Sequence, residues 1–146
     1  MSRFKAQQLR WAHAIITLLF LGLQGLAAVQ LLSGSPRMID AVIGLGYPTY
    51  LVKMLGVATL LGIAAIVTGI GRALKEWAYA GFAFEACGAI ASHLSAGDSL
   101  RTVLWPVAAL VLLTASYFLW KRSLRSAASR RRQRFALYER QAFEGV

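Results

Sequence analysis

Four long apolar stretches, separated by short polar segments, set the pattern of the chain. They cover residues 11–32, 50–70, 77–94 and 103–120. A helix needs about 20 mostly apolar residues to cross the hydrocarbon core of a bilayer, so each stretch is predicted to span a membrane. The first is longer than the apolar core of a secretion signal, and we expect it to be retained. The pattern predicts an all-α fold, an integral membrane four-helix bundle with antiparallel, up-and-down helices.

The polar connections differ in length. The tight turn at residues 71–76 makes the second and third stretches antiparallel neighbours. The connection at residues 33–49 is the longest; Pro36 and Pro48 disfavour a regular helix there, and residues 38–43 favour only a short interfacial turn. We expect a transmembrane domain over residues 1–120 and a basic juxtamembrane tail over residues 121–146.

Composition agrees with a membrane location, since 58% of the residues are hydrophobic. The net charge of +10 is distributed unevenly: basic residues precede the first stretch, lie between the second and third, and follow the fourth. The other two connections each hold one arginine beside an aspartate. By the positive-inside rule both termini are cytoplasmic, which agrees with an even number of spans. Because this topology accounts for the charge, we expect no nucleic-acid partner.

A cluster of basic residues follows the fourth stretch directly. Each one contributes about 1 kcal/mol near an anionic leaflet, so we expect the tail to lie on the membrane surface and bind anionic lipid headgroups. Phe135, Tyr138 and Phe143 would add interfacial anchoring if the tail is helical. The predicted headgroup-binding residues are Lys121, Arg122, Arg125, Arg130, Arg131, Arg132 and Arg134.

One carboxylate, Glu85, lies inside the third stretch. At about 100° per residue it shares a helix face with small residues, namely Gly81, Gly88, Ala89 and Ser92. Small residues let helices approach closely, and an ionisable group at membrane depth is costly unless it faces protein or water. Glu85 is therefore predicted to point into the bundle. Lys53 is offset from it by on the order of 10 Å along the membrane normal and is expected to extend toward Asp98 or the headgroups.

Burial without a nearby cation favours the neutral acid, which would hydrogen-bond one of four polar residues: Thr59, Thr17, Thr114 or Gln24. Two interpretations of Glu85 stay open. It is either an acid that exchanges protons or contacts a ligand, or a protonated residue that holds helices together. The candidates for a ligand site or helix interface are Glu85, Thr59, Gln24, Tyr79, Lys53 and His93.

Redox and metal chemistry find little support in the sequence. His13 and His93 are predicted near opposite ends of their helices and cannot ligate one haem iron. Glu85, Cys87 and His93 point in different directions and lie at different depths, which argues against a metal site, and His93 is expected to bond loop groups such as Asp98. A single cysteine excludes an internal disulfide. Since phosphate-loop, nucleophile-elbow and zinc-protease motifs are also missing, we expect no metal or cofactor and a non-catalytic protein.

Short motifs of aromatic and small residues cover much of the chain. The most specific is the run KEWAYAGF at residues 75–82, which is followed by Gly88-Ala89, Ser92-His93 and Gly97-Asp98. Others are Tyr47-Pro48, Tyr50-Leu51, Leu55-Gly56, Leu61-Gly62 and the run ASYFL at residues 115–119. Together these motifs resemble those of the DoxX-like family of small four-helix membrane proteins, over residues 11–121. The chain departs from that pattern at Thr59, where lysine is common, and at Thr68-Gly69, where a proline often precedes the turn.

The resemblance implies a multi-pass protein of the bacterial inner membrane. Named relatives look like accessory membrane subunits of sulfur or thiol oxidoreductase systems, or like membrane chaperones. We therefore expect a non-catalytic accessory subunit, partner-binding platform or assembly factor. It would pair with a membrane protein or a second copy and use the Glu85 crevice for a helix, a lipid or a quinone-like ligand. The alternative is a small proton-coupled transporter that uses Glu85.

Overall fold

The computed structural model describes the backbone of residues 3–144 and the side chains of residues 7–129 and of Arg132. Over this part every element of secondary structure is a helix, as predicted. The helices are α1 (Arg3–Leu32), α2 (Pro36–Gly44), α3 (Tyr50–Thr68), α4 (Arg72–Ser95) and α5 (Leu100–Glu144).

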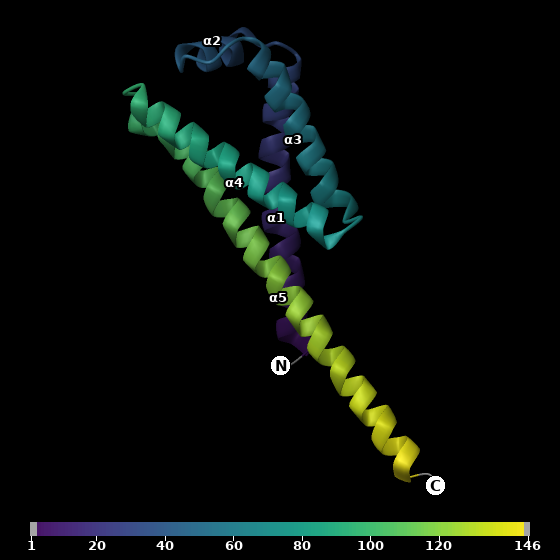
Figure 1. The fold of residues 1–146 in the computed structure, drawn as a ribbon. Helices are drawn as coiled ribbons and strands as arrows, with labels where there is room; N and C mark the ends of the chain where they lie inside the picture. The colour runs from purple at the N-terminus through teal and green to yellow at the C-terminus, as the bar shows by residue number, and fades with distance from the viewer. Residues whose placement is uncertain (1–2, 145–146) are drawn as a thin grey trace.

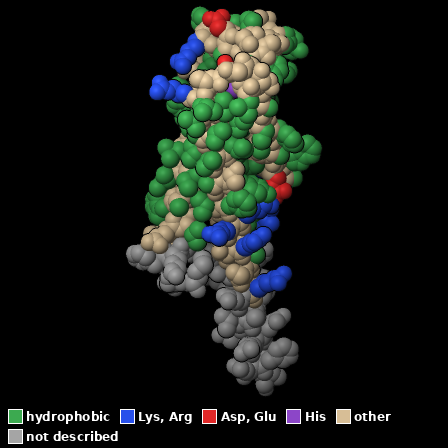
Figure 2. Space-filling model, turned by 90° about the vertical axis from the view of Figure 1, so that its left-hand side faces the viewer, with side chains coloured by type: hydrophobic (Ala, Val, Ile, Leu, Met, Phe, Trp, Pro, Cys, Tyr) green, Lys and Arg blue, Asp and Glu red, His purple; other side chains and the backbone are tan. Residues whose placement is uncertain are grey.

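Each predicted apolar stretch corresponds to one long helix. Among the described residues, α1, α3 and the first part of α5 are long and apolar enough to cross a membrane. The stretch in α4 is long enough, but Glu85, His93 and its small number of large aliphatic side chains keep its hydropathy below that of the other three. Large apolar side chains cover much of the outer surface (Figure 2), and Phe84 and Trp77 are about four-fifths exposed. A surface of this kind suits hydrocarbon, so the chain is a membrane protein.

Two connections differ from expectation. The segment at residues 33–49 contains the nine-residue helix α2 rather than a short turn. Pro36 begins this helix, because proline at the first helical position lacks only an N–H that would be unpaired there anyway. Arg72 to Glu76, which we expected in the turn, already belong to α4. The turn itself is shorter, and Gly69 ends α3 in the left-handed conformation with φ 58°.

The longest helix, α5, does not end with the fourth apolar stretch. It continues without a break to Glu144, so the boundary expected at residue 120 falls inside one helix. Its 45 residues make it about 68 Å long, roughly twice the thickness of the hydrocarbon core. Its C-terminal part extends well beyond the other helices (Figure 1).

The four long helices pack in a cycle: α1 contacts α3, α3 contacts α4, α4 contacts α5, and α5 returns to α1. In Figure 1, α4 and α5 run side by side and cross the pair formed by α1 and α3, while α2 lies at the far end of that pair. Side chains from all four long helices form the core, which comprises Phe20, Ile66, Tyr79, Phe82, Leu113 and Trp120. The core lies toward the α3–α4 turn, and Glu85 lies beyond it toward the α4–α5 loop.

Candidate functional site

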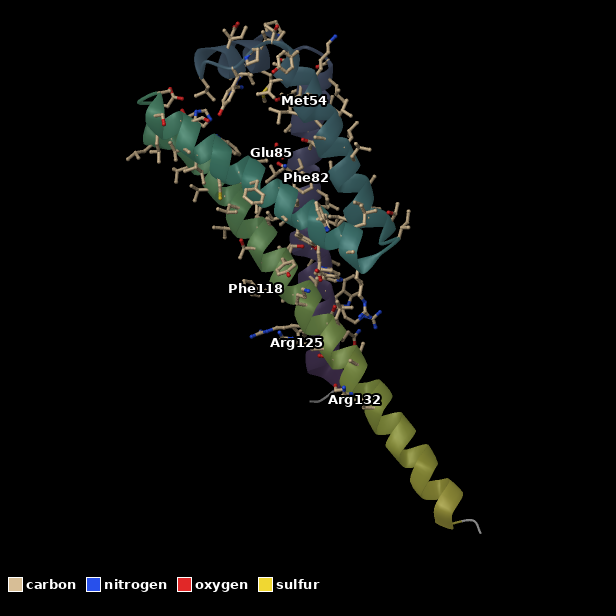
Figure 3. All side chains as sticks on the ribbon, viewed as in Figure 1. Met54, Phe82, Glu85, Phe118, Arg125 and Arg132 are labelled. Carbon is tan, nitrogen blue, oxygen red and sulfur yellow. The ribbon has the colours of Figure 1, made fainter. Side chains whose placement is uncertain are left out.

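Glu85 lies between two cavities near the middle of α4. A smaller one, of about 90 Å³, is lined by α1, α4 and α5 and includes Gln24 and Pro106. A larger one, of about 410 Å³, lies between α3 and α4 and includes Gly62 and Gly81. The Glu85 side chain is half-buried and extends from α4 toward α1 (Figure 3). The carboxyl group thus faces the space between the helices.

The partners expected for Glu85 are not in place. Over residues whose side chains the structure describes, its carboxyl makes no hydrogen bond and no ion pair. The hydroxyls of Thr59 and Thr114 instead donate to the carbonyl one turn earlier in their own helices, at 2.8 and 2.7 Å. A helical threonine can satisfy its hydroxyl in this way without any other helix. Thr17 belongs to another cluster, so only Gln24 shares a cavity with Glu85.

The face of α4 that carries Glu85 is not its most buried face. Tyr79, Phe82 and Ala86 are the buried residues of this helix, and that face is turned from Glu85 by roughly 60 to 120°. Gly81 is exposed, and a Cβ built on it would have no neighbour within 4 Å. The small residues beside Glu85 therefore leave an open groove instead of allowing a close contact within the chain. We call the 410 Å³ space between α3 and α4 the Glu85 groove.

Tyr79 takes part in a hydroxyl cluster that links three helices. Its hydroxyl lies 2.8 Å from Ser116 Oγ on α5, and Ser116 Oγ lies 2.7 Å from Thr17 Oγ1 on α1. Ser116 is completely buried. Sequence reasoning missed Ser116, although a serine in the middle of an apolar stretch requires a partner across the helices. Tyr79 thus stabilises the packing of α1, α4 and α5, and it lies six residues before Glu85 on α4.

His93 and Lys53 lie outside the Glu85 groove. His93 Nδ1 lies 2.6 Å from Asp98 Oδ2, which confirms the predicted contact across the α4–α5 loop. Lys53 is exposed on α3, and within the described side chains it forms no ion pair with Asp98. Of the six candidates, the structure therefore brings together only Glu85 and Gln24.

Charged and aromatic side chains meet where α4 begins beside α5. Glu76 and Lys121 form an ion pair, and Lys75 Nζ lies 5.2 Å from the ring centre of Trp120. Partial burial lowers the pKa of Lys75. Lys121 Nζ also lies 5.4 Å from the ring centre of Tyr117. We call this region, with the turn at residues 69–71 and the arginines that follow Lys121, the basic end. Figure 2 shows Lys and Arg side chains gathered there beside the hydrophobic surface.

Only some of the predicted headgroup-binding residues have described side chains. Arg122, Arg125 and Arg132 are exposed and Lys121 is partly exposed, whereas Arg130, Arg131 and Arg134 lie outside the described side chains, as do Phe135, Tyr138 and Phe143. A helix rises about 1.5 Å per residue, and each headgroup layer is roughly 5–8 Å thick. If α5 runs along the membrane normal, Lys121, Arg122 and Arg125 lie at headgroup depth and Arg132 lies beyond it.

The site offers a carboxyl group, the Gln24 amide and apolar walls. Among the described residues, no three histidine, cysteine, aspartate or glutamate side chains lie together in a way that could hold a metal ion. Cys87 is exposed on α4, away from the groove lining. The Glu85 carboxyl and the Gln24 amide can donate hydrogen bonds to, or accept them from, a polar group that enters from outside. The carboxyl can also exchange a proton with such a group.

Comparison with known proteins identifies the family. A model of the DoxX-like family matches residues 13–116, which includes all or part of every helix from α1 to α5. A search of curated proteins and of solved structures finds no match. The family match covers well over half of the sequence and contains Glu85, Gln24 and the hydroxyl cluster. The chain therefore belongs to the DoxX-like family.

Proposed function

We propose that this chain is a four-span subunit of the bacterial inner membrane, with both termini in the cytoplasm. The short links of α4 to its neighbours support a spanning helix: three residues separate it from α3, and four separate it from α5. At about 1.5 Å per residue the 24 residues of α4 cover about 36 Å, enough for a hydrocarbon core of about 30 Å. The basic end then faces the cytoplasm, where lysine and arginine accumulate.

The function that the geometry supports best is that of a non-catalytic binding subunit whose Glu85 groove receives a transmembrane helix of a partner protein. The observation that carries this proposal is the unpaired carboxyl of Glu85 beside an open groove. A polar group at membrane depth is costly when it lacks a hydrogen-bond partner. A helix lying against Ala58 and Gly81, which are both exposed, could approach closely and supply a hydrogen-bonding side chain to Glu85.

We propose a membrane oxidoreductase or membrane-homeostasis system as the source of this partner. Accessory subunits of membrane oxidoreductases, and factors that maintain or assemble them, bind other membrane proteins and need no catalytic residues of their own. A second copy of the chain would fill the groove by the same contacts. A quinone-like ring is the small molecule that would suit the same groove, since its carbonyl oxygen would accept a hydrogen bond from protonated Glu85.

Site-specific photo-crosslinking in native membranes tests the partner helix. A photo-reactive residue at Ala58, in the groove lining on α3, is expected to give one defined crosslinked product. The same residue at Leu104, which is exposed on α5, is the matched control and should give no such product. With the photo-reactive residue at Ala58, Gly81→Leu fills the groove and should abolish the product, whereas Gly88→Leu, exposed outside the lining, should not. Equal crosslinking from positions 58 and 104 would contradict the proposal.

A second function, proton-coupled transport, has one observation in its favour. Glu85 lines both cavities, the one between α1, α4 and α5 and the one between α3 and α4. Glu85→Gln keeps a hydrogen-bonding side chain but cannot ionise. If this variant stays folded in proteoliposomes and loses a proton flux that the wild type shows, the transporter function replaces the binding subunit. An unchanged flux together with a weakened crosslink supports the binding subunit.

A further inference from the structure

A separate groove lies between α4 and α5, on the opposite face of α4 from Glu85. It has a volume of about 290 Å³ and is lined mainly by Ala80 and Ala83 of α4 and by Leu113, Tyr117 and Phe118 of α5. Ala80 and Phe118 are exposed, so the groove is open to the surroundings of the helices. We call it the α4–α5 groove.

Three of the four polar side chains that line the α4–α5 groove are already bonded, and the fourth, Tyr117, lies beside Lys121. The Thr114 hydroxyl donates to the carbonyl of Leu110, and the Tyr79 hydroxyl is bonded to Ser116. Glu76, at the basic end of the groove, is paired with Lys121. The surface that remains is apolar and aromatic. It suits a hydrocarbon chain better than a ligand that needs hydrogen bonds.

The α5 side of the groove continues into a row of arginines. Arg122 and Arg125 follow Phe118 by four and seven residues, which places all three on one face of α5. Figure 3 shows Phe118 and Arg125 on the same side of the helix. Both arginines are exposed, and within the described part of the chain neither forms an ion pair. They lie about 6 and 10 Å beyond Phe118 along the axis, comparable with the depth of a headgroup layer.

We propose that the α4–α5 groove binds one anionic phospholipid, with an acyl chain along Ala80, Ala83 and Phe118 and the phosphate held by Arg122 and Arg125. Charge complementarity selects this occupant. A partner helix would need small or polar residues on its own surface to fit, whereas a lipid brings the apolar chain and the anion in one molecule. The site does not depend on Glu85, so it can be present whether or not the proposed partner binding is correct.

Direct binding to the full-length protein tests the site. Fluorescent phosphatidylglycerol is titrated against the protein in neutral detergent micelles, beside phosphatidylcholine with the same acyl chains. We expect Arg122→Gln/Arg125→Gln to weaken phosphatidylglycerol binding by roughly 30-fold, about five-fold per arginine. Arg37→Gln/Arg101→Gln makes the same change in charge at the other end of the molecule and should leave binding unchanged. Glu85→Gln should also bind normally.

Two further measurements distinguish the lipid from other anions and other occupants. Ala80→Trp fills the groove from an exposed position and should weaken binding of both lipids. Glycerophosphoglycerol, which carries the headgroup phosphate without acyl chains, should not compete at micellar lipid concentrations. Equal affinity for the two lipids, or competition by the free headgroup, would overturn the proposal. A change of oligomeric mass in Ala80→Trp with normal lipid binding would instead show that a second copy occupies the groove.

Discussion

The ring of Phe82 on α4 fills the space in front of Gly62 on α3. A Cβ built on Gly62 would lie 2.7 Å from two atoms of that ring. On its other side Phe82 meets Phe20 of α1 edge-on, with ring centres 5.2 Å apart. The phenyl ring is thus held between α1 and α3, where it forms part of the lining of the Glu85 groove.

Gly62→Ala is expected to destabilise the protein. The added methyl group would force the buried Phe82 ring away from Phe20, and overpacking of this kind costs about 1–3 kcal/mol. Thermal unfolding in detergent measures the effect. Gly81→Ala is the matched control, because nothing lies near its Cβ and alanine favours a helix by up to about 1 kcal/mol over glycine. A neutral Gly62→Ala would show that α3 and α4 pack less closely than described.

Ser116→Ala should destabilise the packing of α1, α4 and α5 together. It removes two hydrogen bonds and leaves the hydroxyls of Thr17 and Tyr79 without that partner, at an expected cost of about 1–2 kcal/mol. Tyr79→Phe removes only one of the bonds and should cost less. A double-mutant cycle on these two positions should show a coupling of about 0.6 kcal/mol. Additive effects would mean that the two hydroxyls do not interact.

Asp98→Asn should have only a small effect on overall stability. The Asp98–His93 contact is exposed, and exposed ion pairs contribute about 0–1 kcal/mol. The effect of the substitution should be confined to the α4–α5 loop. Hydrogen exchange of the amides at residues 96–99 is expected to become faster, while exchange in the core helices stays unchanged. Faster exchange throughout α4 would contradict this local role.

The crossing of the membrane by α4 can be tested with single cysteines. In a Cys87→Ser background, cysteine is placed at Gly71 in the α3–α4 turn or at Asp98 in the α4–α5 loop. A membrane-impermeant thiol reagent applied to intact spheroplasts should label position 98 and not position 71, because α4 separates the two. Ser126→Cys, on α5 beyond Lys121, should behave like position 71. Labelling of both position 71 and position 98 from outside would show that α4 does not cross the membrane.

Features that depend on local sequence could be predicted well. The long helices follow from the length of the apolar stretches, and the His93–Asp98 contact joins residues only five positions apart. The family followed from the run at residues 75–82. The partner of Ser116 could not be predicted, because it depends on how α1 and α4 are rotated against α5. The threonine partners expected for Glu85 were wrong because Thr59 and Thr114 bond within their own helices and Thr17 bonds Ser116. Pro36 began a helix that we expected it to prevent.

The unbroken course of α5 has a mechanical consequence. Pro106 and Ala109 of this helix line the smaller cavity beside Glu85, and the same helix carries Arg132. The 26 residues from Pro106 to Arg132 extend about 39 Å, so a tilt of about 10° at the cavity would move Arg132 by roughly 7 Å. A continuous helix of this length converts a small rotation at one end into a larger displacement at the other. If α5 crosses the bilayer as proposed, a change at the cavity would in this way displace the part of the helix that lies outside the membrane.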